Sequence, residues 1–227
     1  MNRLVLLAIA GILLPACSQQ ATQANSESSS TAPSAVQTEN QAPNKPENRT
    51  ANQPSFDCGG DKLSSIEILV CQDSELAALD RQLAEVYQAA SAKAINEQPP
   101  LLKAEQRGWI KGRDECWKSD DKHSCAFDNY QMRIAELQAR YRLIAPSAEV
   151  NYQCDGIAAK EVVVSYFATD PATLIAEFGD SVSLMYSQPS GSGSRYQGRN
   201  ESLWEHQGEA RITWGYGTEP MICKLAD

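Results

Sequence analysis

The fold of the C-terminal part of the chain is decided by two runs, Ser190-Gly-Ser-Gly-Ser-Arg-Tyr196 and Leu203-Trp-Glu-His-Gln-Gly-Glu-Ala210. The first run is a small, hydroxyl-bearing loop closed by an aromatic residue, and the second places an aromatic residue among polar ones in a strand-like context. Glycine lets the backbone approach a neighbour closely or adopt a positive φ. The runs are typical of a Gly/Ser hairpin in an all-β domain, and such a loop can also enter a narrow cleft.

The segment around these runs alternates in the manner of short strands from Val150 onward. Gly, Pro, Asp and Ser separate one run from the next. Six or more short antiparallel strands with tight connections favour a small barrel or sandwich. The runs expected as strands are Glu161–Phe167, Thr173–Phe178, Ser181–Tyr186, Ser202–His206, Ala210–Trp214 and Met221–Leu225.

Four features of this segment occur together in one known family. An aromatic-x-Cys-Asp pattern spans Tyr152–Asp155, the Ser/Gly loop spans Ser190–Tyr196, Trp204 leads to Gly208-Glu-Ala, and Cys223 closes the segment. With these features, residues 150–225 resemble the MliC family of bacterial inhibitors of c-type lysozyme. The resemblance implies a barrel of eight strands. It also implies a lysozyme-binding surface formed by Ser192, Gly193, Arg195, Tyr196, His206 and Gln207.

The resemblance assigns roles within the loop. In the family, one serine and one lysine reach the two catalytic carboxyl groups of lysozyme, which flank the scissile bond. Ser192 occupies the serine position. Gly191 and Gly193 are expected to shape the loop, Tyr196 to support it, and Arg195 to hold it rather than to enter the cleft.

The lysine of the family is not kept in this chain. When the run from Trp204 to Glu209 is aligned with the family pattern without a gap, His206 occupies the lysine position. A shift of one residue places Gln207 there instead. A histidine supplies a cation only when protonated, because its ordinary pKa is about 6.5. Glutamine can donate a hydrogen bond but carries no charge. We therefore expect inhibition that is weaker than the family norm or dependent on pH.

The middle segment shows helical periodicity. Apolar residues that follow Ser74 recur on one helix face, Asp73 or Ser74 is a suitable N-cap, and Pro99-Pro100 ends the element. The sequence predicts a small antiparallel helical bundle that gains stability from disulfides. The expected helices are Asp61–Val70, one from Ser74 to the Pro-Pro pair, Leu101–Trp117, and one through Tyr130–Ile144 that Pro146 stops.

The same segment carries a second family pattern. Its residues are Ser55-Phe-Asp-Cys58, Glu67, Cys71, Glu75–Asp80, Tyr87, Gln106–Trp109, Arg113-Asp-x-Cys116, Cys125, Tyr130 and Arg133-Ile134. With them, residues 55–141 resemble the LprI N-terminal domain family, some of whose members are lysozyme inhibitors. We interpret Trp109, Arg113, Asp114 and Tyr130 as structural, with aromatic packing and a partly buried ion pair near a disulfide.

Cysteine usage favours an oxidising compartment. The chain has seven cysteines, of which six remain if Cys17 is set aside. Six cysteines allow fifteen pairings, and pairing within each segment leaves three, all of which join Cys154 to Cys223. Cys58–Cys71 and Cys116–Cys125 are favoured in the helical segment, because each pair closes a short loop between neighbouring helices. No Cys-x-x-Cys motif is present and the chain has two histidines, so we expect no metal site.

The N-terminus has the features of a bacterial lipoprotein signal. Arg3 precedes an apolar core that is too short to span a bilayer, and Leu14-Pro-Ala-Cys17 resembles a lipobox in which Cys17 is lipidated. Residues 1–16 are therefore expected to be a signal peptide, and Ser18 indicates sorting to the outer membrane. Residues 17–54 are rich in polar residues and Pro, so we expect a disordered tether. The helical domain is expected at 55–146 and the barrel at 147–227, with both domains in the periplasm or at the cell surface.

Charge bears on the partner. From Ser147 onward the chain has five Lys and Arg against eleven Asp and Glu. An acidic surface argues against nucleic acid and favours a basic protein such as c-type lysozyme. No Ser/His/Asp set or phosphate loop is present, so we expect neither catalysis nor a cofactor. The sequence thus predicts an α+β lipoprotein inhibitor of two domains. The alternative is a surface adhesion or envelope-assembly module that uses the same acidic barrel.

Overall fold

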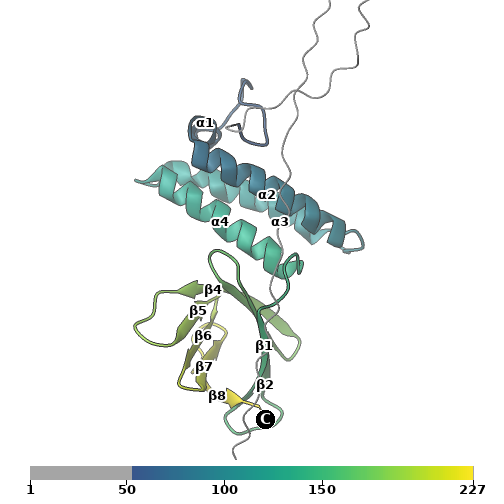
Figure 1. Ribbon diagram of the computed structural model, residues 1–227, viewed down its shortest axis with the longest axis vertical. Coiled ribbons are helices and arrows are strands. Elements are labelled where there is room, and N and C mark those ends of the chain that lie inside the picture. The colour runs from purple at the N-terminus through teal and green to yellow at the C-terminus, as the bar shows by residue number, and fades with distance from the viewer. Residues whose placement is uncertain (1–52, 227) are drawn as a thin grey trace, which may run out of the picture. The chain divides into compact units, whose positions relative to one another are not determined.

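The computed structural model describes residues 53–226. Within them, four α-helices and one short 3-10 helix precede eight strands that close into an antiparallel barrel (Figure 1). This order confirms the α+β class expected from the sequence, with a disulfide-bonded helical bundle followed by a barrel. The expected signal peptide, Cys17 and the tether up to residue 52 lie outside the described residues.

The helical domain begins with a capping box. The helices are α1 (Ser65–Gln72), α2 (Ser74–Lys93), α3 (Leu101–Asp114), the 3-10 helix η1 (Glu115–Lys118) and α4 (Lys122–Arg140). The Ser64 side chain accepts from the Glu67 amide, and the Glu67 carboxylate accepts from the Ser64 amide. This reciprocal pair of hydrogen bonds satisfies two amides at the helix start. The helix α1 therefore begins at Ser65, four residues after the start at Asp61 that the sequence predicted.

The two long helices, α2 and α4, follow the apolar spacing. Asp73 caps α2 by accepting from the amides of Glu75 and Leu76, as expected. Asp121 caps α4, so this helix starts about two turns before Tyr130, the residue at which the apolar pattern of the sequence becomes clear. The bundle core consists of buried residues from all four helices, including Ile66, Val70, Leu76, Leu83, Leu102, Tyr130, Ile134 and Leu137.

Two disulfide bonds cross-link this domain. Cys58–Cys71 ties the N-terminal segment to α1, and Cys116–Cys125 joins η1 to α4. The expected helix Leu101–Trp117 ends at Asp114 as an α-helix and continues as the 3-10 helix η1, which carries Cys116. These pairs are the ones that the sequence favoured.

The barrel is an up-and-down meander in which every strand pairs with its neighbour and β8 pairs with β1. The strands are β1 (Ala148–Cys154), β2 (Glu161–Phe167), β3 (Thr173–Phe178), β4 (Ser181–Gln188), β5 (Ser194–Gln197), β6 (Glu201–His206), β7 (Glu209–Trp214) and β8 (Met221–Leu225). Cys154 and Cys223 are partners in the β1–β8 ladder and form the third disulfide, which closes the barrel covalently. Alternate residues of the strands, such as Val162, Val164, Leu203 and Ile212, fill the interior.

The helical domain and the barrel belong to one compact unit. Ala139 of α4 packs with Phe167 of β2 and Ile175 of β3, and all three are buried. The Arg142 guanidinium lies 5.0 Å from the centre of the Phe167 ring. Among the described residues, no helix is long and apolar enough to cross a bilayer.

Candidate functional site

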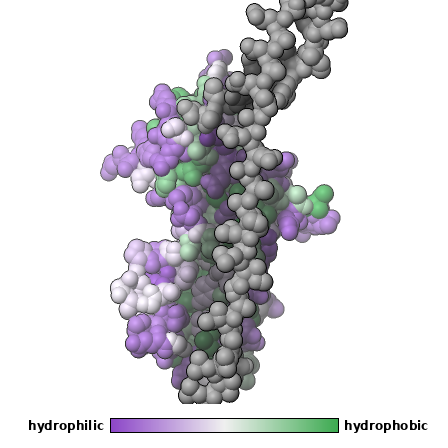
Figure 2. Space-filling view, in the orientation of Figure 1, coloured by the Kyte–Doolittle hydropathy of each residue, from purple (hydrophilic) through white to green (hydrophobic). Residues whose placement is uncertain are grey.

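The Ser/Gly loop connects β4 and β5 and stands out from the barrel wall (Figure 1). Residues from Ser190 to Arg195 are exposed. In Figure 2 this connection is pale rather than green or purple, because serine and glycine have intermediate hydropathy. The loop is therefore a protruding surface made of small side chains.

Gly193 fixes how the loop lies on the barrel. Its φ is +66°, a conformation that L side chains rarely adopt, and a Cβ atom placed there would lie 2.0 Å from the Glu205 carbonyl oxygen. Glu205 belongs to β6 and pairs with Ser194 in the ladder. The loop thus contacts β6 through its backbone, and only glycine permits this contact.

A hydrogen bond from Trp204 holds the loop tip. The indole Nε1 of Trp204 donates to the Ser192 carbonyl oxygen at 3.0 Å, and the Ser190 hydroxyl donates to the same oxygen at 2.6 Å. None of the hydrogen bonds within residues 53–226 uses the Ser192 hydroxyl. The Ser192 side chain is therefore exposed and available while its own backbone is anchored.

Two guanidinium groups lie beside the loop on the outer face of the barrel. Arg195 of β5, Trp204 of β6 and Arg211 of β7 are consecutive partners in the ladders. The guanidinium carbon of Arg211 lies 5.8 Å from the centre of the Trp204 ring, a cation–π contact. Together with Ser192, these residues line a surface hollow of about 450 Å³.

Arg211 was not among the residues that the sequence indicated. Its place follows from register, because Gln207 and Gly208 both have positive φ and form a two-residue turn with His206 opposite Glu209. Counting back two further pairs puts Trp204 opposite Arg211. Recognising the Gln-Gly turn as a hairpin would have indicated from the sequence that Arg211 lies opposite Trp204, but not that it lies beside Ser192.

The two residues considered for the lysine position lie at the end of β6. The His206 imidazole stacks on Trp204, with ring centres 5.7 Å apart and planes within 2° of parallel. Gln207 is exposed in the turn at φ 53°. Both line a second hollow with Arg211 and Glu209. His206 and Arg211 therefore flank the same indole.

Tyr196 lies on the opposite face of β5 from Arg195. Its ring meets that of Tyr166 edge to face at 5.7 Å, and it packs against the barrel core. Burial raises the pKa of Tyr196, so its hydroxyl is neutral at physiological pH. Most of the residues indicated by the sequence share the outer surface, namely Ser192, Gly193, Arg195, His206 and Gln207. Tyr196 instead packs on the inner face of β5.

The four residues of the helical domain that the sequence indicated as structural lie together. Arg113 donates from Nε and Nη2 to the Asp114 carboxylate at 3.0 and 2.7 Å and from Nη1 to the Tyr130 hydroxyl at 2.8 Å. Trp109 meets Tyr130 edge to face at 5.2 Å. Burial acts to lower the pKa of Arg113, but Tyr130 and Asp114 raise it above its ordinary value, so the guanidinium stays charged.

Comparison with known proteins gives two family matches and a set of relatives. Residues 58–142 match the family described as lysozyme inhibitor LprI, and residues 152–221 match the family described as membrane-bound lysozyme-inhibitor of c-type lysozyme, MliC. Proteins named Lipoprotein LprI from Mycobacterium bovis and Mycobacterium tuberculosis are 29% identical over 217 residues, which cover 95% of this chain and 98% of each relative. The helical domain is therefore similar to the LprI family, and the barrel is similar to the MliC family.

Proposed function

We propose that this protein is an envelope lipoprotein that inhibits c-type lysozyme by inserting the loop around Ser192 into the catalytic cleft. The observation that carries the proposal is the anchored loop, whose tip presents a free hydroxyl next to two guanidinium groups. The two family matches and the lipoprotein relatives support the same activity.

The chemistry of the loop fits the target. Lysozyme works with one protonated and one ionised carboxyl group on either side of the scissile bond. A serine hydroxyl can donate to one of these groups, and a cation can pair with the other. Arg211 offers that cation at every physiological pH, because a guanidinium does not lose its proton in this range. His206 adds a second positive charge when it is protonated.

Charge over the whole barrel fits the same partner. The barrel segment is acidic, whereas the surface around Ser192 carries Arg195 and Arg211. A basic enzyme is attracted over long range by the acidic surface, and the local guanidinium groups then meet the acidic centre of its cleft. Added salt should slow association, since it screens the long-range attraction.

Anchoring at Cys17 would place the inhibitor where lysozyme reaches the cell wall. We propose an outer-membrane location, with the tether carrying the folded domains away from the lipid. Thioether and amide-linked acyl chains at Cys17 bury many methylene groups, each worth about 0.8 kcal/mol, so attachment would be stable.

A cell-wall lysis assay tests the loop mechanism. We expect Ser192→Trp to abolish inhibition of c-type lysozyme, because the bulky side chain cannot follow the hydroxyl into the cleft. Arg199→Gln, in the exposed β5–β6 connection, is the matched control for Arg211→Gln. Arg211→Gln should weaken inhibition by about tenfold, as expected for the loss of a charge-assisted contact, and the control should not.

The pH dependence separates the two cations. If Arg211 is the main partner, inhibition by the parent protein changes little between about pH 5.5 and 8, and His206→Gln has a small effect. Inhibition that vanishes at the higher pH and in His206→Gln would assign the charge to His206 instead. Envelope or host-surface binding that survives Ser192→Trp, without any lysozyme inhibition by the parent, would favour the adhesion alternative.

A further inference from the structure

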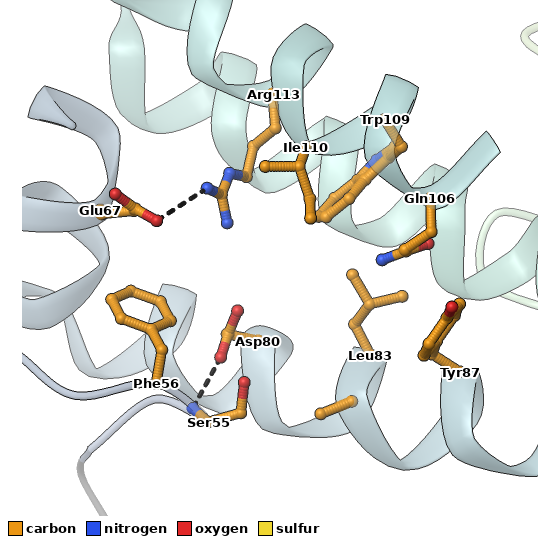
Figure 3. A pocket seen from close by; sticks show the side chains of 11 residues that line it. Ser55, Phe56, Glu67, Asp80, Leu83, Tyr87, Gln106, Trp109, Ile110 and Arg113 are labelled. Carbon is orange, nitrogen blue, oxygen red and sulfur yellow. Dashed lines mark hydrogen bonds and ion pairs between the residues drawn. The ribbon is translucent and has the colours of Figure 1, made fainter. Parts of the chain in front are cut away.

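The helical domain contains a cavity that the loop mechanism does not use. It has a volume of about 320 Å³ and lies between α1, α2, α3 and the segment that precedes α1 (Figure 3). Leu83 and Tyr87 of α2, Trp109 and Ile110 of α3, and Phe56 form its apolar walls. These aromatic and aliphatic walls suit an apolar stem or ring rather than a fully polar ligand.

Charged groups gather at one end of the cavity. Asp80 is 6% exposed and accepts from the Ser55 amide at 2.6 Å and from the Tyr130 hydroxyl at 2.9 Å. Arg113 is 4% exposed and lies opposite, with Glu67 at 3.7 Å (Figure 3). These bonds hold the charged groups in place before any ligand arrives.

The balance of these charges is negative. Two carboxylates, Glu67 and Asp80, and one guanidinium, Arg113, line the cavity. The Arg113 charge is already matched by Asp114, which does not line the cavity and accepts two hydrogen bonds from the guanidinium. Glu67 and Asp80 therefore leave an excess of negative charge at the buried end, where interactions between charges are stronger than in water.

We propose that this cavity binds the side chain of an arginine or lysine from a basic protein partner. The aliphatic stem would lie against Leu83 and Trp109, and the cation would reach Glu67 and Asp80, with the aromatic rings contributing cation–π attraction. We take c-type lysozyme as that partner, and this choice rests on the proposed function. The helical domain then supplies a second contact beside the one made by the barrel.

Titration with a small cationic probe tests the cavity without lysozyme. Nα-acetyl-arginine methylamide is added to the mature chain, and the indole NMR signals of its four tryptophans are followed. We expect the Trp109 signal, assigned with Trp109→Phe, to shift in a saturable way. Glu67→Gln should weaken binding about tenfold, and it keeps the capping box because glutamine can replace glutamate there. Glu85→Gln, an exposed carboxylate of α2 outside the cavity, is the matched control.

Three results would overturn the cavity proposal. The first is that the neutral probe Nα-acetyl-norleucine methylamide shifts the Trp109 signal with the same affinity as the arginine probe. The second is that N-acetylglucosamine shifts that signal with higher affinity. The third is unchanged affinity of the arginine probe in Glu67→Gln. Because the probe does not involve the barrel, failure of the loop mechanism in Ser192→Trp leaves this readout intact. Probe binding together with unchanged lysozyme inhibition by Glu67→Gln would overturn lysozyme as the partner of the cavity.

Discussion

Replacing Gly193 by alanine is the sharpest test of how the loop is presented. The added Cβ atom would lie 2.0 Å from the Glu205 carbonyl oxygen, 3.1 Å from its carbonyl carbon and 3.1 Å from the His206 Cβ. The Glu205 backbone cannot yield easily, because it pairs with Ser194 on one side and Ala210 on the other. The loop must therefore move away from β6 by roughly an ångström or more.

The cost has two parts. A side chain at φ +66° is strained by about 1–2 kcal/mol, and relief of the clash displaces the Ser192 carbonyl from the Trp204 indole, which loses a hydrogen bond worth about 1 kcal/mol. We expect the free energy of unfolding to fall by about 2–3 kcal/mol. The inhibition constant should rise by about tenfold or more, since 1.4 kcal/mol corresponds to a factor of ten.

Gly191 provides the control within the same loop. A Cβ atom there meets nothing within 4 Å, and its φ is not in the left-handed region. Thermal unfolding and lysozyme inhibition should therefore be unchanged in Gly191→Ala and both impaired in Gly193→Ala. If Gly193→Ala inhibits as well as the parent protein, the position of the Ser192 tip does not determine inhibition and the proposed mechanism fails.

Three further outcomes follow from the packing. Tyr130→Phe leaves the buried Asp80 and Arg113 groups short of a partner, so it should cost about 1–3 kcal/mol in urea unfolding, whereas Tyr216→Phe, at a residue 92% exposed, should cost nothing. Burial and Glu97 raise the pKa of Tyr141 to about 12 from its ordinary 10.0. Because the folded state holds this proton more tightly, the stabilisation is complete below about pH 10 and is lost as the pH rises towards 12. Alkaline unfolding followed by tyrosine absorbance at 295 nm should show this loss. Replacing both barrel cysteines by alanine opens a link across 69 residues and should destabilise the barrel by about 4 kcal/mol in the chain-entropy model; an unchanged melting temperature would contradict this.

Much of the fold could be predicted because the signals are local. The 3.6-residue spacing on α2 and the period of two on β7 depend only on which face is buried. The Ser64-x-x-Glu67 capping box was present in the sequence, and recognising it would have placed the start of α1 correctly. No local pattern indicates that α3 gives way to the 3-10 helix η1, which carries Cys116 of the second disulfide.

β5 shows where local reasoning stops. Ser194–Gln197 has four residues, three of them polar, and it is a strand because β4 and β6 pair with it on both sides. Its polar residues do not favour a strand by themselves. The loop tip beside it, and thus the position of Ser192, depends on this pairing.

The sequence by itself determined the two domains' element types, the hydroxyl loop and the acidic charge, because composition and periodicity act along the chain. Only the tertiary structure brought Arg211 beside Ser192 and placed Glu67, Asp80 and Arg113 around one cavity. These groups come from different strands or helices, and their distances are set by strand register and helix packing. Such contacts between distant segments have no signature in any single stretch of residues.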